Sequence, residues 1–290
     1  MVSGEDRVTG ESVLGKPTTE RLGDKSRLVH RLVAQNDAVE SENKIHDDAV
    51  AKRFGFQGGL VPGVTVHGYL TWPAAERWGR AWLEGGTITS RFLLPVYDGE
   101  PVEIWSDPSG DELRVEARNE RGEVCATGVA AMPVSAAPPL DLDSFPNEPM
   151  PTPDRRPPAS PEVLAAVMLG VYERRWHADK ALEYLDIVSD ELDVYRNPPI
   201  AHPGWLLRGA NYVLSQSVRL GPWIHVGSEC RHHSVVTDGE LVQTRGLVVE
   251  LFEKGGHRFV TMDVLTSVDA RPVTSVRHTA IYEPRQVREA

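Results

Sequence analysis

Two apolar stretches of helical length each begin at a Pro-Gly pair. The first spans residues 63–83 and the second spans residues 204–221. Proline fits the first turn of a helix, where its missing N–H is not needed, so each pair is a plausible helix start. Pro73 lies inside the first stretch and removes a backbone donor, so we expect a kink or a split at that residue.

Segments with strand character follow each predicted helix. Polar turns with Gly or Asp separate them, which is typical of an antiparallel meander. The expected strands are 87–96, 100–106, 113–119 and 123–133 in the first half, and 224–236, 241–253, 257–268 and 273–284 in the second. One long helix wrapped by an antiparallel sheet, twice over, is an α+β architecture.

The two halves also share landmarks in the same order. Pro-Gly is followed by a second glycine five residues later in both, and 141 residues separate Gly63 from Gly204. An Arg precedes an Asp-Gly-Glu turn in both, and 140 residues separate Gly99 from Gly239. This agreement predicts a duplication.

Proline is dense between the two halves. Proline has no backbone donor and a fixed φ, which disfavours regular structure, so we expect an extended connection. The predicted organisation is therefore a first repeat over residues 1–132, a proline-rich linker over 133–162 and a second repeat over 163–290.

Composition narrows the class of protein. The net charge of −11 argues against a nucleic-acid partner, and neither a membrane-spanning run nor a signal-like N-terminus is seen. We expect a cytoplasmic protein with no membrane partner. A phosphate-bearing small ligand needs only a local basic patch. Five basic residues are candidates for such a patch, the alternative being that they are solvated surface charges: Lys52, Arg53, Arg77, Arg80 and Arg91.

Several site signatures are missing from the chain. Its two cysteines, Cys125 and Cys230, form no disulfide framework, and no HExxH or CxxC spacing occurs. The chain also lacks a GxGxxG fingerprint, a Walker lysine motif and a GxSxG elbow. We therefore expect no metal site and no bound cofactor.

One segment stands out, with Asn43 and His46 just ahead of a short apolar helix. Asp47 or Asp48 followed by Gly55 is what a capped helix looks like on its own, so we expect both acids to be caps. A Gly-rich turn and Val61-Pro62-Gly63 then lead into the first long helix.

This segment resembles the MaoC-type hydratase/dehydratase family. The match covers residues 43–48, 55–56 and 58–63, about thirty residues of chain. The resemblance implies a hotdog fold, duplicated here as a double hotdog, in which the second repeat is the partner that lacks the catalytic segment. The repeat and the length extend this likeness to most of the chain.

The family pattern Gly-Asp-x-Asn-Pro-x-His is only partly kept. The His falls on His46 and the Asn on Asn43, but Ser41 stands where the catalytic Asp is expected. Glu40 and Lys44 replace the Gly and the Pro. Ser41 could bind water without deprotonating it, and Glu40 or Glu42 could restore a carboxylate if the loop shifts.

The resemblance implies addition of water to a 2-enoyl thioester, or its removal from a 3-hydroxyacyl thioester. In that chemistry His46 is the acid/base, Asn43 orients the water or the imidazole, and the Gly63 amide is the oxyanion donor. Glycine at 63 would let the substrate carbonyl approach the backbone. His67 could face the same cavity or be a packed histidine. Coenzyme A or a phosphopantetheine carrier would enter only as part of the substrate.

Two other functions stay open. A hotdog thioesterase would use a carboxylate near the central helix, for which Glu76 is the candidate, and Ser41 favours a silent protein that binds acyl thioesters or an active partner. Arg91 and Trp205 are candidate substrate-binding residues, Trp205 lining a ligand tunnel if it is not core. We expect a monomeric double hotdog or a homodimer.

Overall fold

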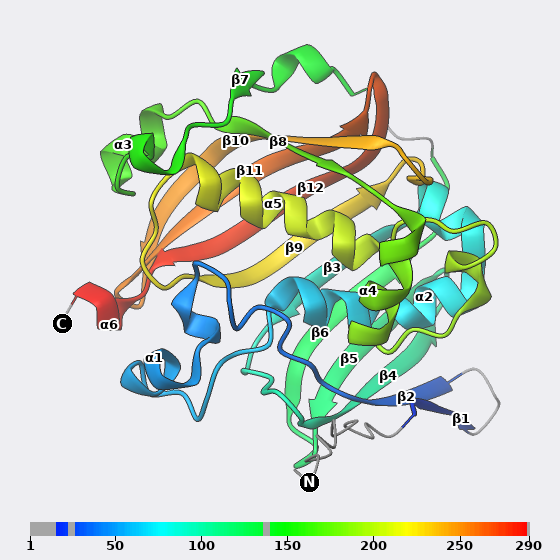
Figure 1. Cartoon of the computed structure of the whole chain (residues 1–290). Coiled ribbons are helices and arrows are strands. Elements are labelled where there is room, and N and C mark those ends of the chain that lie inside the picture. Colours follow the sequence, from blue (N-terminus) through cyan, green and yellow to red (C-terminus); the bar gives the residue numbers. More distant parts are fainter. Residues whose placement is uncertain (1–15, 23–26, 136–139, 289–290) are drawn as a thin grey trace, which may run out of the picture.

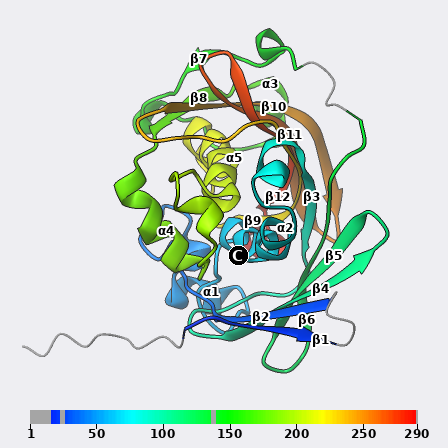
Figure 2. The ribbon, with the colours of Figure 1, turned by 90° about the vertical axis from the view of Figure 1, so that its right-hand side faces the viewer.

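A single sheet carries the whole fold. The computed structural model describes residues 16–22, 27–135 and 140–288, and within them one sheet has the strand order β1-β2-β4-β5-β6-β3-β9-β12-β11-β10-β8-β7. Two long helices, α2 (Gly63–Gly85) and α5 (Pro203–Ser217), lie on one face of this sheet, which curves around them (Figures 1 and 2). The expected α+β double hotdog is thus confirmed.

The last three predicted strands of each half form the expected meander, β4-β5-β6 and β10-β11-β12, but the first, β3 or β9, pairs with the last strand of its half and not with the next one in sequence. The first half contains β1 (Thr18–Leu22), β2 (Arg27–Val33), β3 (Thr87–Phe92), β4 (Pro101–Ser109), β5 (Glu112–Asn119) and β6 (Val124–Ala131). The second contains β8 (Gly170–Arg175), β9 (Ile224–His232), β10 (Leu241–Lys254), β11 (His257–Val268) and β12 (Arg271–Glu283). The halves join where β3 pairs antiparallel with β9, with Thr87 opposite Arg231.

Short elements make up the connections. The helices are α1 (Asp48–Arg53), α3 (Pro161–Ala166), α4 (Ala181–Ile187) and α6 (Arg285–Arg288), and the 3-10 turns are η1 (Lys44–His46), η2 (Leu142–Ser144), η3 (Pro153–Arg155), η4 (Ala178–Lys180) and η5 (Asp193–Tyr195). The described part of the proline-rich segment holds only η2, η3, the start of α3 and the two-residue strand β7 (Glu148–Pro149). Figure 1 shows it passing over the far edge of the second half.

The repeated Asp-Gly-Glu turns make equivalent hydrogen bonds in the two halves. Asp98 Oδ1 accepts from the Asn36 amide at 2.7 Å, and Asp238 Oδ1 accepts from the Ala178 amide at 2.9 Å. Gly99 and Gly239 have φ of 72° and 80°, a left-handed conformation that favours glycine. The shared landmarks therefore have a structural cause.

The two long helices touch through glycine. A Cβ atom added to Gly204 would lie 3.0 Å from the Gly68 Cα and 3.1 Å from the Val64 carbonyl oxygen. Only a residue without a side chain lets α5 approach α2 this closely. Two of the glycines that marked the repeat, Gly68 and Gly204, are thus in contact where the two long helices cross.

The prediction about Pro73 was wrong in its position. The backbone of α2 stays helical through Pro73, and the interruption comes at Gly79, with φ 56° and ψ −140°. A helix can keep its course past a proline when packing holds it, whereas a positive φ breaks the helical path wherever it occurs. Pro73 is buried with the surrounding turn of α2.

Candidate functional site

His46 is held in one tautomer by the backbone. It ends η1, and its Nδ1 lies 2.6 Å from the Leu60 carbonyl oxygen. A carbonyl oxygen only accepts, so Nδ1 carries the proton and Nε2 carries a lone pair. Burial lowers the pKa of the His46 imidazole. His46 is therefore a neutral base at physiological pH.

Asn43 ties the two repeats together. Its Nδ2 donates to the Trp223 carbonyl at 2.9 Å, and its Oδ1 accepts from the Trp223 amide at 3.2 Å. Nδ2 also lies 3.4 Å from His46 Nε2. Because both ends of the amide are engaged by backbone, Asn43 supports the imidazole but has little capacity left to hold a water molecule.

The first long helix begins without a cap. Pro62 precedes Gly63 and contributes no side-chain hydrogen bond, and we find no partner for the Gly63 amide among the described residues. An unpaired amide at the positive end of a helix of this length attracts developing negative charge. The prediction that Gly63 offers a free donor is consistent with this geometry.

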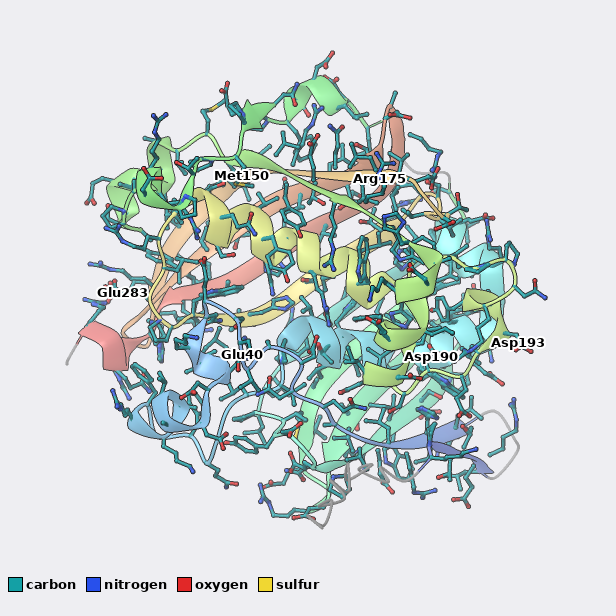
Figure 3. The ribbon with its side chains drawn as sticks, viewed as in Figure 1. Glu40, Met150, Arg175, Asp190, Asp193 and Glu283 are labelled. Atoms are coloured by element: carbon teal, nitrogen blue, oxygen red, sulfur yellow. The ribbon has the colours of Figure 1, made fainter. Side chains whose placement is uncertain are left out.

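The second long helix begins in a closed environment. The Gly204 amide donates to His202 Nδ1 at 3.1 Å, and His202 Nε2 lies 3.3 Å from Asp190 Oδ2. Both partners are buried, their side chains 2% and 1% exposed. Glu40, on the loop before η1, and Asp190 lie well apart in Figure 3. Only the first repeat thus presents an open helix start.

Two cavities meet beside His46. A polar cavity of about 390 Å³ is lined by Asp37, Glu40, Ser41 and Glu42 from the first repeat and by Arg208 and Gln216 from α5. An apolar cavity of about 240 Å³ is lined by Gly63 and by side chains that include Ile45, Phe92, Leu93, Val96 and Ile281. Five residues line both cavities: Asn43, His46, Pro62, Asn211 and Trp223. We call these five the partition.

Of the three carboxylates that line the polar cavity, Asp37 and Glu42 are engaged by other residues, whereas Glu40 is exposed on the loop before η1. Ser41 Oγ donates to the Asn43 carbonyl at 3.2 Å. Glu42 pairs with Arg156, a hydrogen bond that lowers the pKa of its carboxyl group. Asp37 accepts from Thr65 Oγ1 at 2.8 Å and pairs with Arg208 on α5.

Four other predicted residues lie outside both cavities. His67 is buried in the core, 3.1 Å from Ser90 Oγ, and burial lowers its pKa to about 3. Glu76 pairs with Arg21. Arg91 is exposed on β3, and Trp205 packs beneath Arg174, 5.3 Å from its guanidinium carbon. His67 is thus the packed histidine of the two alternatives.

The proposed phosphate patch does not form at this site. Lys52 and Arg53 lie on α1, Arg77 and Arg80 lie on α2, and Arg91 lies on β3. None of the five lines the polar or the apolar cavity. Arg80 is engaged instead with Glu84 one turn along the helix, at 2.6 Å.

Three residues of the second repeat were missed from the sequence. Asn211 and Trp223 belong to the partition, and His225 lines the apolar cavity. A Cβ atom at Gly63 would lie 2.8 Å from His225 Nδ1. The glycine is thus needed to make room for His225, a reason that the sequence alone does not show. No local motif marks these three residues.

Asp47 is a helix cap, as predicted, whereas Asp48 is not, because its side chain accepts from the Gly59 amide at 2.7 Å. The Asp47 side chain accepts from the Val50 amide at 2.9 Å at the start of α1. Replacing Asp47 with Ala should lower the free energy of unfolding by about 1 kcal/mol, since one first-turn amide loses its partner. Urea denaturation measures this. A change below about 0.3 kcal/mol would mean that the capping bond is not formed in solution.

Comparison with known proteins defines the fold and no more. No protein-family model matches the sequence, and no curated protein matches it. Among solved structures, a MaoC-like dehydratase matches with a TM-score of 0.55 at 12% identity, covering 94% of this chain and 99% of its own. A conserved hypothetical protein from Mycobacterium tuberculosis with a double hotdog fold matches with a TM-score of 0.56 at 13% identity, covering 92% and 96%.

Other matches with the same fold have a different description. A putative thioesterase from Novosphingobium aromaticivorans matches with a TM-score of 0.53 at 11% identity, covering 88% of this chain and 96% of its own. In the part of the chain that the structure describes, no helix is both long and apolar enough to cross a membrane. The chain thus has the double hotdog fold that a MaoC-like dehydratase and a putative thioesterase also have.

Proposed function

We propose that the protein adds water to 2-enoyl thioesters, or removes it from 3-hydroxyacyl thioesters. The observation that carries the proposal is a neutral His46 at the meeting of a polar and an apolar cavity, whose Nε2 lone pair meets only Asn43 Nδ2, at 3.4 Å, among the described residues. The open amide of Gly63 lies in the lining of the same apolar cavity. A base and an oxyanion donor are the two groups that this chemistry needs most.

Hydration then proceeds with one imidazole. His46 Nε2 takes a proton from water as the water oxygen bonds to C3 and the C2–C3 double bond opens. The electron pair moves to the thioester oxygen, which the Gly63 amide stabilises. The imidazolium then returns the proton to C2 as the enolate collapses, so the base is regenerated and the atoms balance. Dehydration is the reverse.

A single acid/base suits the missing carboxylate. Ser41 occupies the position where the family has its Asp, and a serine hydroxyl does not titrate near neutral pH. Among the carboxylates that line the polar cavity near it, Asp37 is already bound by Thr65 and Arg208. His46 is therefore the group to which we assign both proton transfers.

The two cavities suit the two parts of such a substrate. An acyl chain is apolar and fits the cavity lined by Ile45, Phe92 and Ile281. The amides of a phosphopantetheine arm need polar partners, which the cavity lined by Ser41, Gln216 and Arg208 offers. No cofactor beyond this carrier enters the proposed reaction.

A direct assay tests the proposal. The purified protein is incubated with short, medium and aromatic enoyl-CoA esters, and loss of the conjugated enoyl absorbance is followed beside release of free thiol. Loss of absorbance without thiol supports hydration. Thiol release alone would point to a thioesterase, although Glu76 lies outside both cavities. Binding without turnover would identify a silent acyl-thioester protein.

The pH dependence follows from the environment of His46. Its neutral form is the base, and burial lowers its pKa from 6.5. Hydration should thus decline at low pH, as the imidazole becomes protonated, with a midpoint below 6.5. The measurement is kcat/KM against pH. A midpoint above 6.5 would contradict this assignment.

Folding must be followed across the same pH range. Burial lowers the pKa of His67, His232 and His278 to about 3. The unfolded chain therefore binds more protons than the folded one below pH 6.5, and stability falls as the pH drops. Tryptophan fluorescence separates this loss of stability from protonation of His46.

A further inference from the structure

The partition contains a second amide besides that of Asn43. Asn211 lies on α5, one turn after Arg208, and lines both cavities together with His46 and Pro62. Its Oδ1 is buried and has no hydrogen-bond partner. Its Nδ2 is not among the buried atoms and makes no hydrogen bond with the described residues, so the amide is free to turn its oxygen toward the accessible side.

The two amides differ in what they can still bind. Asn43 donates to the Trp223 carbonyl and accepts from the Trp223 amide. Asn211 makes no such hydrogen bond with the described residues. A buried polar atom without a partner lowers stability, so it is retained in a folded protein when something other than folding needs it.

We infer that Asn211 is the positioning residue for the attacking water. This inference rests on the proposed function. With its amide turned so that the oxygen faces the cavity, Asn211 accepts one water proton while His46 Nε2 accepts the other, which leaves an oxygen lone pair free to attack C3. In dehydration the same amide holds the leaving water. Asn211 thus supplies from the second repeat what Ser41 does not supply from the first.

This assignment also explains why the amide lies where the cavities meet. Water enters from the polar side, where Arg208 and Gln216 line the cavity, and the enoyl carbons occupy the apolar side. A polar side chain that lines both cavities can bind a water molecule that moves from the polar cavity to the apolar one. Of the other partition residues, Pro62 has no hydrogen-bonding side-chain atom and Trp223 has only its indole N–H, which cannot accept a proton from water.

Three variants of one residue test the inference. Asn211→Ala should lower kcat roughly 10- to 100-fold with KM within about threefold, because water is misplaced while the acyl chain still binds. Asn211→Asp keeps an acceptor oxygen and should retain more of the rate than Asn211→Ala. Asn211→Leu should be inactive and should melt about 2–4 °C higher, since it removes the unpaired amide.

A matched control and the wild type make the outcomes distinct. Gln243→Ala removes an amide on β10 outside both cavities, whose only partner in the described part of the chain is the exposed Glu173 carboxylate, and should leave kcat and KM unchanged. An active wild type whose Asn211→Ala variant keeps its kcat overturns this inference alone. A wild type that hydrates no enoyl-CoA overturns the proposed function and this inference together.

Discussion

Replacing His46 with Gln should lower the hydration rate about 10³-fold, which is the typical size of a general acid–base contribution. Gln can still donate an amide N–H toward the Leu60 carbonyl, the group that holds His46 Nδ1 at 2.6 Å. It cannot take up a proton. The variant therefore removes the base and leaves the loop supported.

The measurement is initial-rate loss of the enoyl absorbance, at saturating substrate and at low substrate. If His46 carries both proton transfers, kcat falls and KM changes little. Asp47→Ala is the neighbouring control, because it weakens the start of α1 without touching either proton transfer. A His46→Gln variant with more than about one tenth of the wild-type rate would remove His46 from the mechanism.

The repeats were predictable because their signals are local. Each Asp-Gly-Glu turn needs a left-handed glycine at Gly99 or Gly239 and an acid that accepts a backbone amide. Each long helix begins at a Pro-Gly pair. Such features lie in adjacent residues, so α2, α5 and the strands that follow them could be predicted from local patterns.

The strands β2 and β8, next to the two ends of the sheet, could not be predicted in the same way. Arg27–Val33 forms β2 by pairing with β4, and Leu28 lies opposite Ser106. Gly170–Arg175 forms β8 beside β10, with Arg175 opposite Leu241. Both depend on partners about seventy residues away, and strand propensity depends strongly on such context.

The candidate site was predictable only on the side of the first repeat. His46 and Asn43 lie in one contiguous segment, and the structure places both in the partition. The other wall comes from Asn211 and Trp223, and Asn43 reaches Trp223 across 180 residues of sequence. Because no spacing rule links segments that far apart, only the fold reveals the complete site.

Gly204→Ala should be the most destabilising of the simple glycine substitutions at the helix crossing, costing about 3 kcal/mol. The added Cβ would lie 2.3 Å from Tyr184 Oη, and also close to the Gly68 Cα and the Val64 carbonyl oxygen. Two of these three atoms belong to the backbone of α2. The helices must therefore move apart, because Tyr184 is itself buried and cannot yield alone.

A series of Ala variants measures this by urea denaturation. Gly68→Ala meets the Val188 side chain at 2.9 Å and should cost less, since a methyl group can shift. Gly85→Ala meets nothing within 4 Å at the end of α2 and should stabilise the protein by about 0.5–1 kcal/mol. Loss of the crossing should also disturb hydration, since α2 carries Gly63 and α5 carries Asn211. A Gly204→Ala variant as stable as Gly85→Ala would show that the helices do not meet at this glycine. It would also show that this helix crossing does not hold the two sides of the site, one from each repeat, against each other.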